Sequence, residues 1–442
     1  MTPAAQGSLA AGFQRSTAAS ILFLLVFAYF WVTLAPFADQ SSPDAALPWG
    51  GNSNFVNQII VVAMAGALLI AIRRDPSRHF MLQPHLLLIV ILLWFSAVSV
   101  FAADPASAFR RIAFAVLVCF SANALLLLPR SEEGFAKLLA VGVLAVLGLA
   151  YFGVLALPDR AIHQITDAVE GTLAGDWRGH FGHKNLASAA MVLAIFCGLY
   201  VMRAWSRWLG VVVVALAAIF LVNTGGKTAI AMLPFILALA TVFERYEWLR
   251  IPIAVGGPLA LNVIVVGASL SEPIKRVVLG LGIDPTFTDR ADIWRLAMGA
   301  IADRPWTGYG FQSFWQTDSL VYGGGSVETW AVNAAHSHNA YLEAMINAGF
   351  PGLVLIVVWL LVLPVRDVGR AKASGNDPAL TRLFIRIWLF ATFSACLEST
   401  FFTNTGPLWF SMLVAVAGLR FQARASLVHV QPPIGSPRLA HA

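Results

Sequence analysis

The chain has 442 residues, of which 58% are hydrophobic and only 12% are charged, and its mean hydropathy is +0.75. Soluble domains carry roughly 25% charged residues, so this composition predicts an integral membrane protein and excludes an ordinary soluble domain. The formal net charge of +6 does not indicate nucleic-acid binding, because basic residues in a membrane protein first mark the cytoplasmic loops. Cys119, Cys197 and Cys396 lie inside apolar runs and give neither a disulfide framework nor a thiolate metal site.

Apolar runs of about 17 to 25 residues can cross a bilayer as helices, and we predict about twelve such spans in an all-α polytopic membrane protein. The first run is better explained as a retained helix than as a signal peptide, because many further spans follow it. The runs lie near residues 19–37, 55–72, 85–101, 108–128, 137–157, 185–202, 208–223, 228–243, 251–270, 350–365, 383–400 and 405–420.

The basic residues gather on alternate loops, as the positive-inside rule requires. Both termini are then cytoplasmic, and the chain divides into nine spans (1–270), a long external loop (271–349), three more spans (350–420) and a cytoplasmic tail (421–442). Long external loops commonly carry function. The cytoplasmic set holds 18 of the 29 Lys and Arg residues: Arg15, Arg73, Arg74, Arg78, Arg130, Lys137, Arg203, Arg207, Arg245, Arg250, Arg366, Arg370, Lys372, Arg382, Arg386, Arg420, Arg424 and Arg438.

The remaining cations fall on or near the external face, where the positive-inside rule does not explain them. Snorkelling toward lipid headgroups accounts for any one of them as well as substrate binding does. Lys227 fits snorkelling less well, because Gly225-Gly226 precedes it at a membrane boundary. The segment around Lys227 is not a nucleotide-binding loop, because no strand precedes it and it lacks the phosphate-loop spacing. Its flexible glycines and its cation nevertheless suit the binding of an anion. The set comprises Arg110, Arg111, Arg160, Arg178, Lys184, Lys227, Lys275, Arg276, Arg290, Arg295 and Arg304.

The external loop 271–349 contains signals for short helices. Asp289 with Asp292 predicts a helix start, and Pro305 ends that helix before a glycine-bearing turn at 305–310. One apolar face is formed by Ile293, Trp294, Ala297 and Ile301. The run Gly323-Gly324-Gly325 indicates either a lid or a linker.

The stretch HSHNAYLEAM, residues 336–345, predicts a short interfacial helix from about Ser337 to Ala348, stopped by Gly349. It is too short to cross the bilayer. Asn339, Glu343 and Asn347 would form a polar face, and Tyr341, Ala344, Met345 and Ala348 an apolar one. His338 would lie in the first turn, where the helix dipole favours the neutral imidazole that can act as a base.

Three interpretations compete for His336 and His338. A metal site would need more ligands at regular spacing, and Glu343 completes no known zinc pattern. A structural role, in which the imidazoles only hydrogen-bond the loop, suits His336 better than His338. Base catalysis by His338 is the third interpretation and the one we favour.

The order of five motifs resembles that of the O-antigen ligase and polymerase superfamily, over roughly residues 178–365. Where this chain has Gly226-Lys227-Thr228, the family commonly has a Ser-Arg-Thr-like group, and Lys lacks the bidentate fork of Arg. The motifs are Gly179-His180-Phe181-Gly182-His183-Lys184-Asn185, Thr224-Gly225-Gly226-Lys227-Thr228, Asp289-Arg290-Ala291-Asp292-Ile293-Trp294, Pro305-Trp306-Thr307-Gly308-Tyr309-Gly310 and His338-Asn339-Ala340-Tyr341-Leu342-Glu343.

The resemblance implies a GT-C-type glycosyltransferase that takes a glycan from undecaprenyl pyrophosphate at the periplasmic face of the Gram-negative inner membrane. For the ligase branch, the acceptor is a sugar hydroxyl of lipid A-core. The implied transfer inverts the anomeric carbon and uses no metal or other cofactor, and the partners are the lipid-linked O-antigen, lipid A-core and membrane lipid. The histidine that the family requires falls at His338.

This chemistry needs a base for the acceptor hydroxyl and positive charge for the leaving pyrophosphate. His338 is the predicted base; no Asp-x-Asp pair occurs in the external segments, so fixed cations are the better candidates for the phosphates. Arg290 and Lys227 are the leading phosphate ligands, with Arg178 and Lys184 behind them. Weaker candidates for substrate contact are His336, Asn339, Tyr341, Arg110 and Arg111.

Three other functions remain open at this stage. An O-antigen polymerase would use a second lipid-linked glycan as acceptor, and a protein O-oligosaccharyltransferase would use a Ser or Thr hydroxyl of a protein. A secondary transporter or flippase also suits twelve spans, but such proteins place polar groups near the midplane and keep loops short. Motif order favours the ligase.

Overall fold

The computed structural model describes residues 3–32, 35–41, 55–75, 77–79, 86–168, 171–280, 282, 290–322, 330–373, 378–403 and 406–424. The regular secondary structure of these residues is helical, and the one bridge between extended segments joins Ile162 to Trp177. Three predictions lie wholly or partly outside the described residues: the role of Asp289, the Gly323-Gly324-Gly325 lid or linker, and most of the tail 421–442.

Most helices follow one another through short connections, and longer segments occur at 32–54, 162–183 and 322–339. Their bounds are α1 Pro3–Trp31, α2 Phe55–Ile72, α4 Leu86–Ser99, α5 Pro105–Leu125, α6 Glu132–Ala156, α7 Pro158–Ala161, α8 Lys184–Ala204, α9 Arg207–Asn223, α10 Lys227–Arg245, α11 Gly257–Leu270, α12 Glu272–Gly280, α13 Arg290–Asp303, α14 Asp318–Val321, α15 Ala340–Val357, α16 Leu363–Ala373, α17 Pro378–Ser394 and α18 Pro407–Gln422. Two π-helical turns, Pro252–Gly256 and Val358–Val362, lead into α11 and α16.

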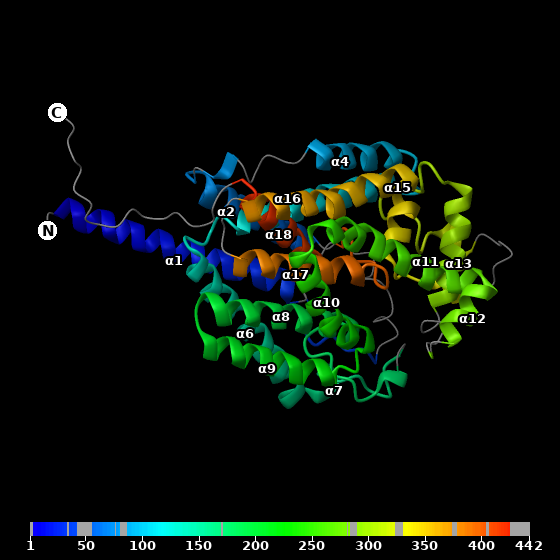
Figure 1. Ribbon diagram of the computed structural model, residues 1–442, viewed down its shortest axis with the longest axis horizontal. Coiled ribbons are helices and arrows are strands. Elements are labelled where there is room, and N and C mark those ends of the chain that lie inside the picture. Colours follow the sequence, from blue (N-terminus) through cyan, green and yellow to red (C-terminus); the bar gives the residue numbers. More distant parts are fainter. Residues whose placement is uncertain are drawn as a thin grey trace.

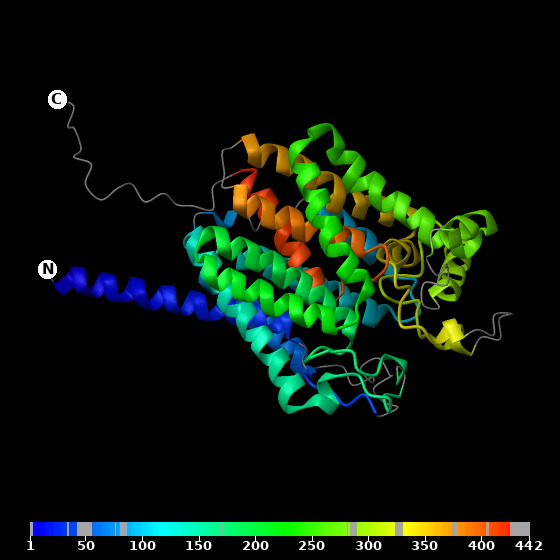
Figure 2. The same cartoon turned by 60° about the horizontal axis from the view of Figure 1, so that its bottom comes forward.

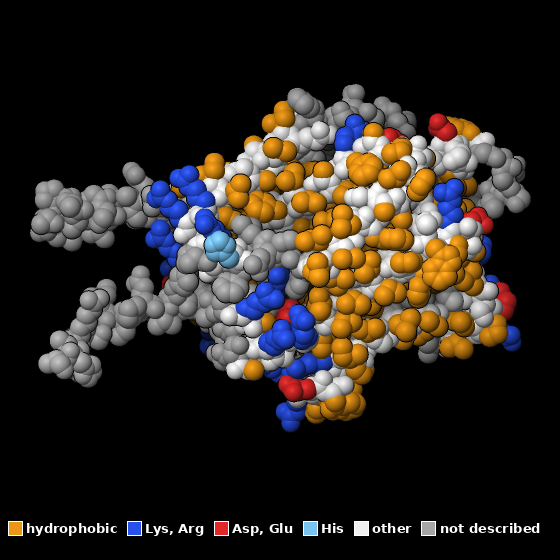
Figure 3. Space-filling model, turned by 90° about the horizontal axis from the view of Figure 1, so that it is seen from above, with side chains coloured by type: hydrophobic (Ala, Val, Ile, Leu, Met, Phe, Trp, Pro, Cys, Tyr) orange, Lys and Arg blue, Asp and Glu red, His pale blue; other side chains and the backbone are white. Residues whose placement is uncertain are grey.

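Six of the described helices are long and apolar enough to cross a membrane, and five shorter apolar helices accompany them. Each of the twelve predicted spans overlaps a helix. Figure 3 shows apolar side chains over the middle of one face and Lys and Arg side chains gathered toward one end. The chain therefore has the architecture of a multi-pass membrane protein. The six are Pro105–Leu125, Glu132–Ala156, Lys184–Ala204, Lys227–Arg245, Glu247–Leu270 and Ala340–Ala373.

Helix α8 is the most buried of these six, with 72% of its span inside the protein, and it packs against α6, α9 and α17. Figures 1 and 2 both show α8 and α9 side by side. Gly198 of α8 and Gly210 of α9 face each other so closely that a methyl group on either would press on the other's carbonyl oxygen. Small residues at the interface allow such close contact between membrane-spanning helices.

The short helices of the predicted external loop, residues 271–349, lie together at one end of the bundle. Figure 1 shows α12 and α13 standing across the ends of the long helices, opposite the end at which α1 begins. The predicted apolar face of α13 is confirmed, because Ile293, Trp294, Ala297 and Ile301 are all buried. Trp294 Nε1 also donates to the carbonyl of Ser337, which ties α13 to the segment before α15.

Helix α15 begins three residues later than predicted. Asn339 is its N-cap, and the helix runs from Ala340 into the membrane-spanning part without ending at Ala348. Gly349 interrupts it with φ 67° and ψ −174°, and Pro351 follows. A short first segment therefore precedes the span, as the sequence indicated, but it is joined to the span through a kink at Gly349.

The Pro305–Gly310 turn secures this kink. Tyr309 N donates to the carbonyl of Ile346 at 2.8 Å, Gly310 N to that of Asn347 at 3.1 Å, and Phe350 N to that of Pro305 at 2.7 Å. Carbonyls at the end of the first α15 segment, which have no partner within the helix, are satisfied in this way. The turn thus holds the first segment of α15 in place.

Gly308→Ala is expected to destabilise the protein by about 1 to 3 kcal/mol. Gly308 has φ +63°, and a methyl group there would overlap the carbonyl oxygen of Ile346. Gly148→Ala is the matched control, because Gly148 lies within α6 with no atom within 4 Å of the added methyl group. The thermal unfolding midpoint of each purified protein measures the effect; equal midpoints for the two variants would contradict it.

Candidate active site at Glu398

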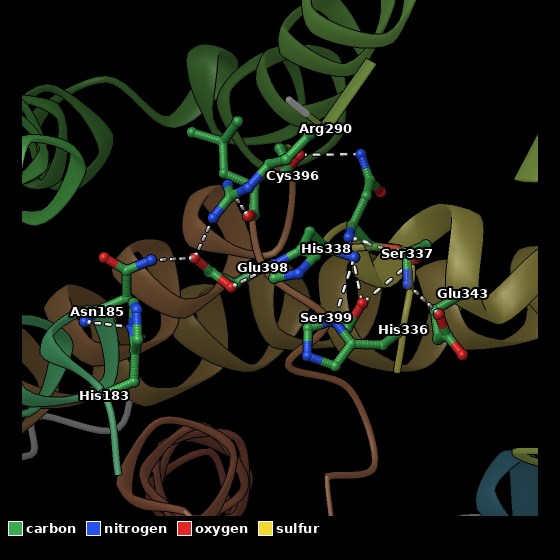
Figure 4. Close-up of polar contacts among 12 residues, drawn as sticks. His183, Asn185, Arg290, His336, Ser337, His338, Glu343, Cys396, Glu398 and Ser399 are labelled. Carbon is green, nitrogen blue, oxygen red and sulfur yellow. Dashed lines mark hydrogen bonds and ion pairs between the residues drawn. The ribbon is translucent and has the colours of Figure 1, made fainter. Parts of the chain in front are cut away.

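Side chains from three separate segments meet at the carboxylate of Glu398 (Figure 4). Arg290, the first residue of α13, donates from Nη2 to Oε1 at 2.7 Å. His338 Nδ1 lies 3.4 Å from Oε2, and Asn185 Nδ2, near the start of α8, donates to Oε1 at 3.3 Å. Three of the five sequence motifs are thus joined by one carboxylate.

Glu398 lies in a turn that follows α17, and this turn is bonded to the His338 segment. Ala340 N donates to the carbonyl of Ala395 at 2.8 Å, and Asn339 N donates to Ser399 Oγ at 3.2 Å. The turn itself closes through Glu398 N, which donates to the carbonyl of Ser394 at 2.9 Å. These backbone bonds fix the separation of His338 and Glu398.

His338 lies outside the helix, so the prediction that it occupies the first turn is wrong. Its φ is 51°, a left-handed conformation that non-glycine residues seldom adopt, and Asn339 takes the capping position instead. Such strain persists only where the surrounding structure holds it, and it is common at active sites. The side chain is 31% exposed and is therefore accessible to a substrate.

Glu343 is not part of an exposed polar face, as the spacing had suggested. It is buried, and its carboxylate accepts from Trp315 Nε1 at 3.0 Å and from Ser337 N at 3.0 Å. Asn347 is buried as well and accepts from Gln312 N at 3.1 Å. Both polar side chains therefore anchor the external loop to α15.

The charge state of Glu398 follows from its neighbours. Burial alone would raise the pKa of this carboxyl, but Arg290, and then the two histidines, lower the pKa to about 2. Glu398 is consequently ionised throughout the neutral pH range. It offers a permanent negative charge to His338 Nδ1.

His336 is a neighbour of the site. Its Nδ1 accepts from His338 N at 3.3 Å, and the two rings are 4.2 Å apart between centroids. Burial, and then the positive potential of His338, lower the pKa of His336 to about 4. A neutral His336 that accepts the His338 N–H helps to set the backbone of the loop, and its predicted substrate contact stays a prediction.

Lys184 and the Thr224–Thr228 motif lie on the Asn185 side of the cluster. Lys184 Nζ pairs with Asp176 Oδ2 at 2.5 Å, and the Asp176 carboxylate packs against Gly225, where an added methyl group would overlap it. Gly225 also has φ +60°, so both its backbone conformation and the lack of space for a methyl group require glycine at this position. Lys227, the first residue of α10, is exposed and has no side-chain partner among the described residues.

The other predicted substrate ligands bond to the protein itself. Arg178 is buried and donates to the carbonyls of Ala38 at 2.9 Å and Phe181 at 3.4 Å. Arg110 donates to Ser107 Oγ, and Arg111 to the carbonyl of Gln312. A role for these three arginines in substrate binding stays a prediction.

Asn339 and Tyr341 are engaged inside the protein too. Asn339 Nδ2 donates to Asn262 Oδ1 at 2.6 Å and to the carbonyl of Cys396 at 2.9 Å, and its Oδ1 caps α15. The Tyr341 hydroxyl donates to the carbonyl of Thr392 at 3.0 Å. These bonds explain both side chains as supports for the His338 loop, and direct substrate contact by either stays a prediction.

A cavity of about 630 Å³ lies on the face of α13 that points away from Arg290. Phe101, Tyr309 and Phe314 give it aromatic walls, and Asp303 and Arg304 give it charged groups. The Arg304 guanidinium lies 4.7 Å from the centroid of the Tyr309 ring. Apolar walls with a few polar groups are typical of small-ligand sites and suit a sugar ring with its hydroxyls.

Glu398 is the site residue that sequence reasoning missed, because the predicted span 383–400 enclosed it. Helix α17 ends at Ser394, so Glu398 lies beyond the helix. The available signal was an acidic residue within an apolar run, which is expensive in a membrane and usually functional. Within the described residues, no group of three or more His, Cys, Asp or Glu side chains could hold a metal ion.

Comparison with known proteins finds relatives of part of this chain. Residues 210–357 match the family described as O-Antigen ligase, a region that includes Lys227, Arg290 and His338. The chain is also 25% identical over 241 residues to the exopolysaccharide production protein ExoQ of Rhizobium meliloti (strain 1021), covering 49% of this chain and 52% of that protein. It therefore spans about half the length of this relative. The predicted resemblance is confirmed, in that residues 210–357 of this membrane protein are similar to the O-antigen ligase family.

Proposed function

We propose that the protein is an O-antigen ligase, which transfers O-antigen polysaccharide from undecaprenyl pyrophosphate to a sugar hydroxyl of lipid A-core. Its twelve predicted membrane spans form a GT-C-type fold in the inner membrane of a Gram-negative bacterium, with both termini cytoplasmic and Glu398 at the periplasmic face. The observation that carries this proposal is the cluster of His338, Glu398 and Arg290, because it combines a base, a carboxylate to orient the base and a cation for phosphate.

His338 acts as the general base. When Nδ1 donates its proton to Glu398, Nε2 is the unprotonated nitrogen of the neutral ring. Nε2 has no hydrogen bond within the described part of the chain, so it can accept the proton of the acceptor hydroxyl. The new bond joins the acceptor oxygen to the anomeric carbon, and the pyrophosphate leaves from the opposite face with the electron pair. Glu398 stabilises the imidazolium that results, as the triad aspartate does in serine proteases.

Arg290 stabilises the leaving pyrophosphate. A guanidinium carries five N–H donors, and Arg290 uses one on the carbonyl of Leu397 and one on Glu398. The remaining donors are available to phosphate oxygens, which arginine binds through charge-assisted bonds. Lys227 is the second cation, because it is exposed and unpaired within the described chain, whereas Lys184 is already neutralised by Asp176.

Glu398→Gln is expected to lower kcat by about 10- to 100-fold and to move the acid limb of the pH–rate profile to lower pH. Glutamine cannot stabilise the imidazolium, so protonation of the base would require more acid. In the wild type the acid limb does not report Glu398, because its pKa of about 2 lies below the working range. Stabilisation from the ionised carboxylate is complete above its unfolded pKa of 4.5 and is lost only as the pH falls toward 2.

Glu398→Asp is the companion variant for that pH–rate profile, because it keeps the charge and changes only the reach of the carboxylate. We expect its acid limb to stay where the wild type has it, with a smaller loss of kcat. An unchanged rate and profile in Glu398→Gln would show that the carboxylate does not assist the base.

Purified protein mixed with lipid-linked O-antigen and lipid A-core tests the function. We expect a joined product without added nucleotide, and full activity in excess EDTA, because fixed cations neutralise the phosphates. Absence of product from an intact, folded preparation would contradict the ligase assignment. Loss of activity in EDTA that magnesium or manganese restores would contradict the metal-free mechanism.

A polymerase is the second candidate, and the likeness to an exopolysaccharide production protein favours it. In that reaction both donor and acceptor are lipid-linked glycans. His338 would again act as the base, and Arg290 would again stabilise the leaving pyrophosphate. Lipid-linked glycan supplied without lipid A-core distinguishes the two functions. A polymerase lengthens the glycan into a ladder of products, whereas a ligase leaves it unchanged.

A further inference from the structure

A second polar cavity lies at the opposite end of the bundle from Glu398. Its volume is about 490 Å³, and it opens between the α8–α9 turn and the first turns of α17. Figures 1 and 2 show α8 beside α17, and the two helices pack against each other along their length. Four arginines from these separate segments line the cavity: Arg203, Arg207, Arg382 and Arg386.

The charge of these arginines is poorly compensated by the protein. Arg382 Nε donates to both carboxylate oxygens of Glu244, at 3.0 and 3.2 Å. Arg386 Nε is buried without a hydrogen-bond partner, and neither Arg203 nor Arg207 has an ion pair within the described residues. Like charges that face one cavity repel one another, and an anion bound between them would relieve that repulsion.

The backbone adds to the positive potential. Arg207 is the first residue of α9, and Arg382 is the fifth residue of α17, so both helices begin at this cavity. The N-terminus of a helix carries a partial positive charge and favours anions. Side chains and helix ends therefore act in the same direction.

The remaining wall of the cavity is apolar and includes Leu199, Met202 and Leu383. A free anion would not interact favourably with the apolar wall. A lipid would contact both parts of the cavity, with its phosphate headgroup at the arginines and its acyl chains at the apolar wall. The positive-inside rule accounts for arginines at this end of the helices but not for four of them around one cavity. Basic pockets between transmembrane helices on the cytoplasmic side are typical lipid headgroup sites.

We infer that this cavity binds the phosphate headgroup of an anionic phospholipid from the leaflet on that side. The four guanidinium groups contact the phosphate oxygens, and the acyl chains contact the apolar wall of the cavity at Leu199 and Met202. The site is separate from the proposed transfer reaction and holds whether or not the protein is a ligase.

Full-length protein, purified in a neutral detergent and stripped of lipid, tests this inference with three probes: cardiolipin, phosphatidylethanolamine and inorganic phosphate. Native mass spectrometry measures bound lipid, and thermal unfolding measures stabilisation. We expect one cardiolipin to remain bound and to raise the unfolding midpoint, with no such effect from phosphatidylethanolamine. Arg203→Gln combined with Arg386→Gln is expected to weaken cardiolipin binding by about tenfold or more, through the loss of charge-assisted bonds.

Arg74→Gln is the control, because Arg74 is an exposed arginine on the same predicted side and lies outside the cavity. An equal loss of cardiolipin binding in Arg74→Gln would overturn the inference by showing that general surface charge is responsible. An equal rise of the midpoint with inorganic phosphate would overturn the lipid as ligand. If the double variant does not fold, Arg203→Gln alone decides, because Arg203 is exposed; unchanged cardiolipin affinity would contradict the site.

Discussion

His338→Ala is expected to reduce the rate of glycan transfer by about 10²- to 10⁴-fold, the usual contribution of a positioned general base. The acceptor hydroxyl would then lose its proton only to water. Glu398 cannot replace the imidazole as the base, because its pKa of about 2 makes the carboxylate a very weak base. The rate of product formation from lipid-linked glycan and acceptor, at saturating concentrations of both, measures the loss.

His336→Ala is the matched control for His338→Ala, because the two rings are adjacent and only one of them bonds to Glu398. We expect a much smaller loss, since removal of His336 Nδ1 leaves the His338 ring and its carboxylate in place. A normal rate in His338→Ala would refute the mechanism, and equal losses in the two variants would make the histidines a structural pair.

Arg290→Ala is expected to lower turnover by about 10²- to 10³-fold, as the loss of a fixed charge stabiliser does in other enzymes. The variant loses the cation for the leaving phosphate, and it also leaves the Glu398 carboxylate without its closest partner. Arg290→Lys should restore part of the rate, because lysine supplies the charge without the planar fork. The ratio of kcat to KM for the lipid-linked donor measures both effects.

Arg276→Ala controls for charge at the same end of the molecule, because Arg276 is an exposed residue of α12. We expect nearly wild-type turnover in this variant. If the unfolding midpoints of Arg290→Ala, Arg290→Lys and Arg276→Ala lie within a few degrees of the wild-type midpoint, the loss of turnover is catalytic and not a folding defect. Equal turnover in Arg290→Ala and Arg276→Ala would exclude Arg290 as the phosphate ligand.

The candidate site was partly predictable from sequence. Motif order pointed to His338 and Arg290, which are 48 residues apart, and the structure joins them through Glu398. Glu398 itself was out of reach, because an apolar run gives no sign of where its helix stops. The end of α17 at Ser394 depends on bonds to the His338 segment, such as Ala340 N to the carbonyl of Ala395.

The first segment of α15 also shows which features follow from the local pattern and which depend on packing. Its approximate position, the interruption at Gly349 and the burial of Tyr341 all follow from local residue types. Helical spacing put Glu343 and Asn347 on a polar face, but both are buried beneath the external loop. Trp315 and Gln312, which bond to them, come from a segment whose path the spacing cannot reveal.

Composition and periodicity are local quantities, and they were sufficient to predict the membrane class and the positions of the helices. Which side chains share a hydrogen bond depends on how distant segments pack, and that packing placed Glu398 against Arg290 and His338 and left Asn339 with structural bonds. Packing also gathered Arg203 and Arg386 around one cavity, where the sequence predicted only separate cations on loops of one side. Each of these contacts joins residues far apart in the chain, and a sequence pattern within a short window carries no information about such contacts.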